Sequence, residues 1–187
     1  SGAAAYSAQE HSVVANADVG GGTSNISVFK DGKLIATLCA DIGGRLIRFE
    51  PWTYKVQGFI NGGEITSKHL GITLEKGKIL SQREILKIGA ALAEALISIL
   101  KGKPNNLARE LALGELVEDI VPEYVMFSGG VGRLIYDEED IADADSMTRF
   151  GDLGPALAIE VKKAIHSDSM KLLKPAETIY ATVIGAG

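Results

Sequence analysis

An acid followed by three consecutive glycines is the part of the chain with the clearest potential for chemistry. Asp18 lies at the end of an apolar run, and Gly20, Gly21, Gly22 and Thr23 follow it after one residue, Val19. Backbone amides of glycine can approach phosphate oxygens closely because no side chain obstructs them. A threonine hydroxyl adds a donor, and a carboxylate at a strand end is suited to holding Mg²⁺ through water beside substrate phosphates. The pattern predicts a phosphate-binding loop with Asp18 as the candidate metal-binding and catalytic residue.

The segment after the glycines separates this loop from the helix-based phosphate motifs. A P-loop or a dinucleotide-binding fingerprint opens a helix, whose N-terminal amides hold the anion. Here the run Ile26–Phe29 follows, then an Asp31-Gly32 turn and a further apolar run. A turn of this type between such runs is a strong hairpin signal. The glycines therefore belong to a strand-turn-strand unit. The plain alternative is a tight hairpin that merely needs glycine conformations, although three glycines exceed what a two-residue turn requires.

Two further glycine-rich segments follow predicted strands. Gly43 and Gly44 come directly after the hairpin, and the segment Ser128–Gly132 follows a short apolar run. Either segment alone reads equally well as a simple turn. A dinucleotide-binding fingerprint at the second one would require another glycine where this chain has Ile135. Three such elements in order, with a capped helix between them, are harder to obtain by chance.

Composition and charge limit the classes of function. The chain has 187 residues, of which 46% are hydrophobic and 23% charged, and a net charge of −5. These values fit one globular domain. No Lys/Arg cluster suggests nucleic-acid binding, and no apolar run approaches the ~18–20 residues that span a bilayer. The lone Cys39 excludes an internal disulfide, and with three scattered histidines we expect no zinc site. We expect a cytoplasmic protein that binds neither nucleic acid nor membrane.

The secondary-structure elements that position these loops are predicted to be strands in the first part of the chain and mainly helices after it. Strands are predicted at about 13–19, 26–30, 33–40, 45–49 and 54–60, the first three forming an antiparallel meander. Residues 61–80 are expected to be an irregular insertion that carries small strands. A long helix follows at 81–101, because Ser81 and Glu84 make a capping box and apolar residues then recur every three or four positions.

In the second half of the chain we predict fewer and shorter helices and strands. They are a helix at about 105–114, a buried strand at 124–128, an acidic surface loop at 137–140, a helix capped by Asp152 with Pro155 in its first turn, and a closing strand at 178–184. Strands 124–128 and 178–184 are expected to join the meander in one sheet. The loops at Gly20–Thr23 and Gly129–Gly132 are expected to line one cleft.

In this order the motifs resemble those of the actin, sugar kinase and heat-shock chaperone ATPase superfamily. The segment Asp18–Asn25 is similar to its second phosphate element, Asp-x-Gly-Gly-Gly-Thr-x-Asp, Asp41–Gly44 to an Asp-x-x-Gly-Gly run of the chaperones, and Ser128–Gly130 to its adenosine element. The resemblance implies an α/β fold, an actin-like ATPase (ribonuclease H-like) lobe whose mixed sheet has an antiparallel three-strand meander and packed helices. It implies ATP and Mg²⁺ as cofactors, with the nucleotide contacted by Gly20, Gly21, Gly22, Thr23, Gly43, Gly44, Ser128, Gly129, Gly130 and Gly132.

The amino-acid sequences of four segments point to one family within this superfamily. Residues 16–26, 39–47, 127–132 and 181–187 are similar to the reactivating factors for ethanolamine ammonia-lyase of ethanolamine utilisation systems. That family implies a chaperone-like protein that restores the adenosylcobalamin-dependent lyase by ATP-dependent exchange of damaged cobalamin. The lyase is then the expected protein partner, a homo-oligomer is compatible with the family, and association with a bacterial microcompartment is implied as an option.

The chain also departs from the superfamily pattern. Asn25 stands where the pattern has a second aspartate, and an amide can orient a water or a phosphate but cannot take a proton. We expect Asn25 to be a catalytic position with slow hydrolysis. The superfamily's first phosphate element is absent, so residues 1–187 are expected to be a single C-terminal lobe without its N-terminal lobe, binding ATP weakly. Two alternatives stay open: a non-catalytic interaction or scaffold domain of this superfamily, and a lobe of a small-molecule kinase.

Overall fold

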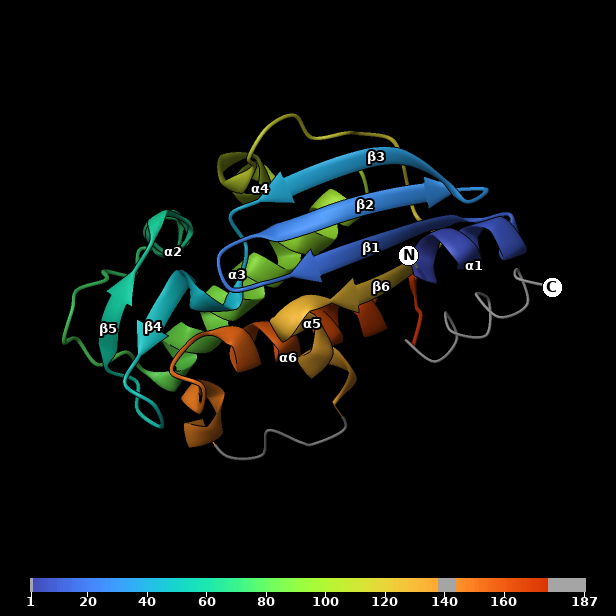
Figure 1. Cartoon of the computed structure of the whole chain (residues 1–187). Helices are drawn as coiled ribbons and strands as arrows, with labels where there is room; N and C mark the ends of the chain where they lie inside the picture. Colours follow the sequence, from blue (N-terminus) through green and yellow to red (C-terminus); the bar gives the residue numbers. More distant parts are fainter. Residues whose placement is uncertain (1, 138–143, 175–187) are drawn as a thin grey trace.

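A mixed five-stranded sheet is the central element of the computed structural model, which describes residues 2–137 and 144–174 (Figure 1). The strand order is β3-β2-β1-β6-β7. The strands are β1 (Val13–Val19), β2 (Ser24–Lys30), β3 (Lys33–Ala40), β6 (Tyr124–Ser128) and β7 (Lys171–Leu172). The predicted meander is confirmed, because β2 pairs antiparallel with both β1 and β3. Its turn has positive φ at Asp31 (48°) and Gly32 (77°), as a tight hairpin requires.

The buried strand at 124–128 is confirmed as β6, which runs parallel to β1. The carboxyl ends of both strands therefore lie at the same end of the sheet, and the glycine-rich loops follow them there. The fifth sheet position belongs to the two-residue strand β7, which pairs parallel with β6. The predicted closing strand at 178–184 lies outside the described residues, as does most of the acidic loop predicted at 137–140.

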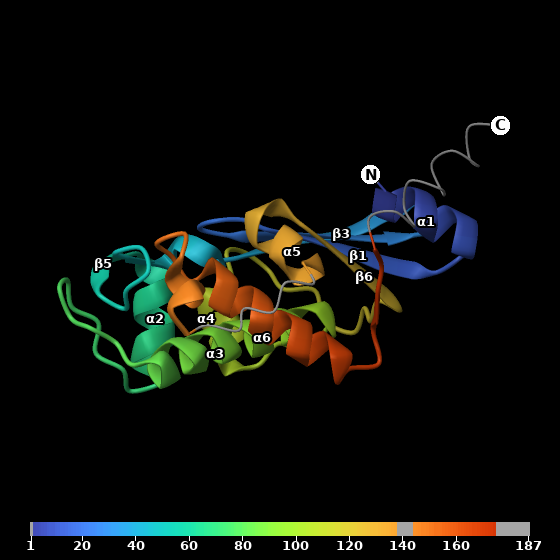
Figure 2. The same cartoon turned by 90° about the horizontal axis from the view of Figure 1, so that it is seen from below.

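Helices cover one face of the sheet as a second layer (Figure 2). They are α3 (Gln82–Leu100), α4 (Asn106–Leu111), α5 (Gly129–Tyr136) and α6 (Gly154–His166). The apolar stripe predicted for the long helix is buried, with Ile85, Ile88 and Leu92 fully inside. Gly89 lets α3 approach α6 closely, since a Cβ there would meet the Ala156 carbonyl oxygen at 3.1 Å.

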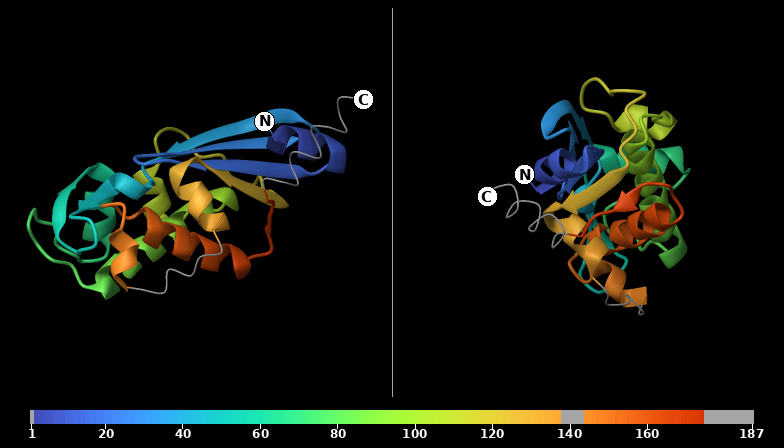
Figure 3. Two further views of the ribbon diagram at one scale, coloured as in Figure 1. Left: turned by 60° about the horizontal axis from the view of Figure 1, so that its bottom comes forward. Right: turned by 90° about the vertical axis from the view of Figure 1, so that its right-hand side faces the viewer.

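Helix α1 (Gly2–Glu10) covers part of the opposite face of the sheet, at the end where β1 begins (Figures 2 and 3). Ala3 and Val14 are buried together there, and the rings of Tyr6 and Tyr124 meet edge to face with centroids 5.2 Å apart. The sequence did not predict this helix. Because α1 is short, the carboxyl half of β1 keeps a polar open face, on which Asp18 is exposed.

A smaller unit lies at the far end of the molecule from α1 (Figure 3). It holds the short 3₁₀ helix η1 (Gly44–Leu46), the antiparallel pair β4 (Ile47–Phe49) and β5 (Val56–Phe59), and helix α2 (Asn61–His69). Helix α2 corrects the prediction of an irregular insertion at 61–80, of which only the part after His69 is irregular. Gly62 and Gly63, which suggested a loop, are needed for packing. A Cβ on either would meet the carbonyl oxygen of Asp41 or Leu46 at 2.6 or 2.5 Å.

We expect the capping box of α3 to make a pH-dependent contribution to stability. The Ser81 hydroxyl accepts from the Glu84 amide, and the Glu84 carboxylate accepts from the Ser81 amide at 2.7 Å. That backbone hydrogen bond, with a second from the hydroxyl, lowers the pKa of Glu84. A carboxyl whose pKa is lowered by folding stabilises the native state above its unfolded pKa, and this contribution is lost as the pH falls through the lowered value.

Ser81→Ala should therefore reduce the free energy of unfolding by about 1 kcal/mol at neutral pH, and by less at a pH below the lowered pKa of Glu84, where the carboxyl is protonated. Urea unfolding of both proteins at the two pH values measures the difference. Ser167→Ala, beyond the end of α6, is a matched control. An equal loss for Ser81→Ala at both pH values would show that the hydrogen bond from the Ser81 hydroxyl does not stabilise the ionised Glu84 carboxylate.

Candidate functional site

Two of the glycine loops touch through their backbones. The Gly44 amide donates to the Gly20 carbonyl at 3.0 Å, and the Arg45 amide donates to the Gly21 carbonyl at 2.6 Å. Gly43 has no room for a side chain, because a Cβ there would collide with the Gly21 carbonyl. The buried Ser24 hydroxyl adds a hydrogen bond to the Ile42 carbonyl at 2.7 Å. The first hairpin and the Gly43-Gly44 turn therefore form one rigid backbone unit.

Two more segments join this unit. The Leu153 amide donates to the Gly44 carbonyl at 2.7 Å. A Cβ on Gly44 would lie 3.0 Å from both the Gly154 Cα and the Val131 side chain. The Gly43-Gly44 turn is thus enclosed by the first hairpin, the start of α5 and the start of α6, which brings residues far apart in the sequence to one point.

Gly129 is required where β6 turns into α5. Its φ is +82°, and a Cβ would collide with the Asp18 carboxylate and lie 2.5 Å from the Val19 carbonyl oxygen. The predicted adenosine element is therefore the first turn of α5 itself. Its glycines let the helix begin directly against the end of β1 and against Asp18.

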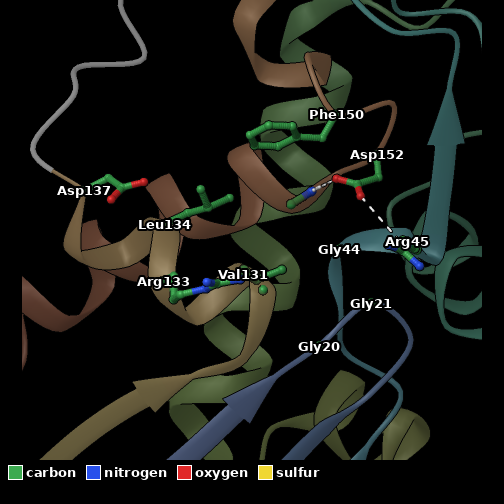
Figure 4. A pocket seen from close by; sticks show the side chains of 12 residues that line it. Gly20, Gly21, Gly44, Arg45, Val131, Arg133, Leu134, Asp137, Phe150 and Asp152 are labelled. Atoms are coloured by element: carbon green, nitrogen blue, oxygen red, sulfur yellow. Dashed lines mark hydrogen bonds and ion pairs between the residues drawn. The ribbon is translucent and has the colours of Figure 1, made fainter. Parts of the chain in front are cut away.

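The loops line one pocket of about 710 Å³ (Figure 4). Its wall is formed by Gly20, Gly21, Gly44, Arg45, Gly130, Val131, Arg133, Leu134, Asp137, Phe150, Asp152 and Gly154. The prediction that the first hairpin and the Gly129–Gly132 segment share a cleft is confirmed by Gly20, Gly21 and Gly130. Gly44 places the Gly43-Gly44 turn on the same wall.

The other predicted loop residues lie in these loops without being part of the pocket wall. They are Gly22, Thr23, Gly43, Ser128, Gly129 and Gly132. Thr23 closes the hairpin turn, since its carbonyl accepts from the Gly20 amide at 3.0 Å. Gly132 is a packing position, because a Cβ would lie 3.1 Å from the Phe127 carbonyl carbon.

The two predicted catalytic residues are neighbours across β1 and β2. Asp18 and Asn25 are register partners, so their side chains share the open face of the sheet. Both are exposed. Asn25 lines a different groove, together with Thr37 and Cys39. Asp18 thus stays close to the glycine loops through Gly129, whereas Asn25 is not part of the pocket that these loops line.

Asp152 is a pocket residue that the sequence suggested only as a helix cap. One carboxylate oxygen accepts from the Gly154 amide at 2.8 Å, at the first residue of α6. The other lies 4.0 Å from Nε of Arg45, and the Asp152 side chain is only 16% exposed. Burial raises the pKa of this carboxyl, and the hydrogen bond from Gly154 and the Arg45 charge oppose the rise. The pocket therefore holds a largely buried carboxylate, and Gly154 and Arg45 only partly offset the cost of its burial.

Sequence reasoning missed the other side chains on the wall. Arg45 and Arg133 directly follow glycine loops, and this adjacency is the signal that could have found them. Phe150 gave no signal of its own. It is 59% exposed, and the Arg149 guanidinium lies 4.7 Å from its ring centroid. Figure 4 shows Phe150 and Leu134 on one side of the pocket and the glycine backbones with Arg45 on another.

This arrangement combines features that suit an anionic ligand with a flat organic part. The guanidinium groups of Arg45 and Arg133 are balanced in number by the carboxylates of Asp137 and Asp152 on the same wall, so the preference for negative charge comes from the first turns of α5 and α6. The apolar side chains offer a surface for a ring. Within residues 2–137 and 144–174, no three His, Cys, Asp or Glu side chains come together as metal ligands. None of the helices in that part of the chain is long and apolar enough to cross a membrane.

The meander, the parallel β1–β6 pair and the glycine loops at their ends define an α/β lobe of the actin-like ATPase class. The family model described as "Ethanolamine utilisation protein EutA" matches residues 1–187, and the chain belongs to this family. It is 33% identical over its whole length to the ethanolamine ammonia-lyase reactivase EutA of Salmonella typhimurium strain LT2. The corresponding Escherichia coli K12 protein is 32% identical. The chain spans 39% of the length of each of these relatives.

Replacing Asp152 tests whether its charge opposes folding. A raised pKa means that the native state binds more protons than the unfolded state, so this group lowers stability as the pH rises. Asp152→Asn removes the charge and keeps an acceptor for the Gly154 amide. We expect its free energy of unfolding at neutral pH to equal or exceed that of the wild type, with the gain absent at about pH 3.

Urea unfolding at both pH values measures the effect, with the exposed Asp31→Asn as a control. A loss of stability for Asp152→Asn at neutral pH would mean instead that the charge is needed to hold Arg45 or the α6 terminus.

Proposed function

We propose that the chain supplies the adenosine and phosphate loops of a nucleotide site in a reactivating factor for ethanolamine ammonia-lyase. The observation that carries the nucleotide part is the convergence of Gly20, Gly21, Gly44 and Gly130 on one pocket wall. The names of the two curated relatives, both ethanolamine ammonia-lyase reactivases, support the protein-level part. The lyase is accordingly the proposed partner, and ATP with Mg²⁺ the proposed ligands.

The phosphates and the sugar are assigned to this wall because one of its glycines, Gly130, has no close neighbour in the fold. A Cβ on Gly130 would meet nothing within 4 Å, so this glycine is not required by packing. It lies in the first turn of α5, where free amides and the helix dipole favour an anion. Arg45 and Arg133 lie on the same wall and can contact an anion directly, although Asp137 and Asp152 balance their charge. Because packing does not require a glycine at position 130, the absence of a side chain there supports the close approach of a ligand to the backbone.

Asp18 is the proposed Mg²⁺ contact, through water. Its carboxylate lies against Gly129 at the end of β1, and it is exposed. A single carboxylate suits Mg²⁺, which keeps most of its waters and completes its shell with substrate phosphates. Asn25 is its cross-strand neighbour and carries no charge. Slow turnover is therefore proposed, with the chain acting mainly through nucleotide binding.

The scaffold alternative predicts that the pocket takes no nucleotide, and the kinase alternative predicts a second, small-molecule substrate in the same cleft. Neither has an observation of its own in the described residues. The test uses the 187-residue chain, whose affinity for ATP is expected to be weak. A measurement that detects millimolar binding is therefore required.

Titration of the ¹⁵N-labelled chain with Mg·ATP should shift amide signals of Gly20, Gly21, Gly44 and Gly130 together. Gly130→Ala, which adds a methyl group in open space, should keep the fold and bind slightly less tightly. Gly130→Val should weaken binding at least about tenfold, since a branched side chain blocks the wall and about 1.4 kcal/mol suffices for that change. In Asp18→Asn, Mg²⁺ should no longer strengthen binding.

Inorganic phosphate and Mg·GTP serve as comparison ligands that separate phosphate binding from base recognition. Unfolding curves of both Gly130 variants show whether the fold is intact. Shifts scattered over the surface, or equal ATP binding by wild type and Gly130→Val, would exclude this pocket and favour the scaffold alternative.

A further inference from the structure

Strand β3 forms an edge of the main sheet and is long for an edge strand (Figure 1). It has eight residues, Lys33–Ala40, and contains no proline. At its carboxyl end the Leu113 amide donates to the Cys39 carbonyl at 2.9 Å, and Ala112 bridges to Ala40. In the part of the chain that the structure describes, no backbone hydrogen bond reaches the outer side of residues 33–38. An open row of donors and acceptors is a template for another strand.

The open part of this edge also exposes apolar side chains. Leu34 is 55% and Ile35 42% exposed. Ile35 has no partner in β2, because the register shifts between Val28 and Phe29. This bulge and the charge of Lys33 are the two features that normally protect an edge. No charged residue lies in the rest of the strand.

Charges at the two ends of the edge are complementary when the strand meets itself. Lys33 begins β3, and Glu115 lines a groove of about 460 Å³ beside Thr37, Leu38 and Cys39 at the other end. In an antiparallel pair of identical strands centred on Ile35, residue 33 of one copy lies opposite residue 37 of the other. Lys33 then approaches Glu115 of the second copy, and two-fold symmetry makes this contact twice.

We propose that β3 is a self-association edge, where a second copy of this chain adds its own β3 antiparallel and extends the two sheets into one. The Ile35 side chains of the two copies meet at the two-fold axis, and each Leu34 lies beside this contact, opposite residue 36 of the second copy. Lys33, a protective charge in the monomer, pairs with Glu115 of the second copy. The proposal does not depend on the nucleotide pocket, which lies beyond the carboxyl ends of β1 and β6.

Such a dimer is weak, because a few backbone hydrogen bonds and two apolar side chains bury less than the ~1,200 Å² of a standard interface. We expect a dissociation constant between ~10 μM and ~1 mM. Sedimentation equilibrium of the 187-residue chain over that range should show a monomer–dimer equilibrium that is unaffected by nucleotide.

Three substitutions on the edge and one elsewhere test the register. Lys33→Glu and Glu115→Lys should each weaken the dimer about tenfold, because each turns two attractive contacts into repulsive ones. The double variant should recover wild-type affinity within about threefold. Ile35→Lys should abolish the dimer, because it places like charges opposite one another. Ile79→Lys is the matched control, since Ile79 is 71% exposed but lies away from the edge.

Circular dichroism and urea unfolding of each variant verify that the fold is retained. If the chain stays monomeric at the highest concentration, the proposal is overturned. A strand of another protein would then be the favoured partner of the β3 edge. Failure of the double variant to recover affinity, or equal weakening by Ile79→Lys, also overturns it.

Discussion

The contact between the Gly43-Gly44 turn and the first hairpin is the constraint on which the rest of the site depends. Two amide-to-carbonyl hydrogen bonds join the backbones, and Gly43 leaves no space for a Cβ. Main-chain groups held by other main-chain groups cannot relax as side chains do, so the hairpin and the turn keep one geometry. Both α5 and α6 then begin against Gly44, and the position of four loops follows from one backbone contact.

The pocket formed in this way contains a group that does not favour folding. Asp152 is largely buried, and its raised pKa shows that burial outweighs the help from Gly154 and Arg45. Buried charges that are only partly compensated concentrate at functional sites, and local departures from good folding rules are expected there. The position of Asp152 beside Arg45 on the pocket wall therefore argues for a role toward a ligand.

The sequence predicted the parts of the fold that local rules determine. The meander follows from its tight turn, helix α3 from its capping box and stripe, and the strand-turn-strand form of the first glycine loop from glycines that lead into a strand. Helix α2 was missed because Gly62 and Gly63 serve packing against distant carbonyls, which no local pattern reveals. Side chains such as Phe150 reach the pocket only through the tertiary arrangement. Asn25 was placed at the site by its motif, but it lies on β2, one strand farther from β6 than Asp18, and lines another groove.

Strand β3 connects the two surfaces that are proposed to bind partners. Its outer edge at residues 33–38 is open, and its carboxyl end leads through Asp41 into the Gly43-Gly44 turn. This connection alone does not couple the two surfaces, because coupling requires an element with two arrangements that each ligand binds with different affinity. The turn is held by backbone contacts without free space, and β3 is bonded to β2 on both sides of the bulge at Ile35. The structure thus favours two independent sites on one rigid sheet.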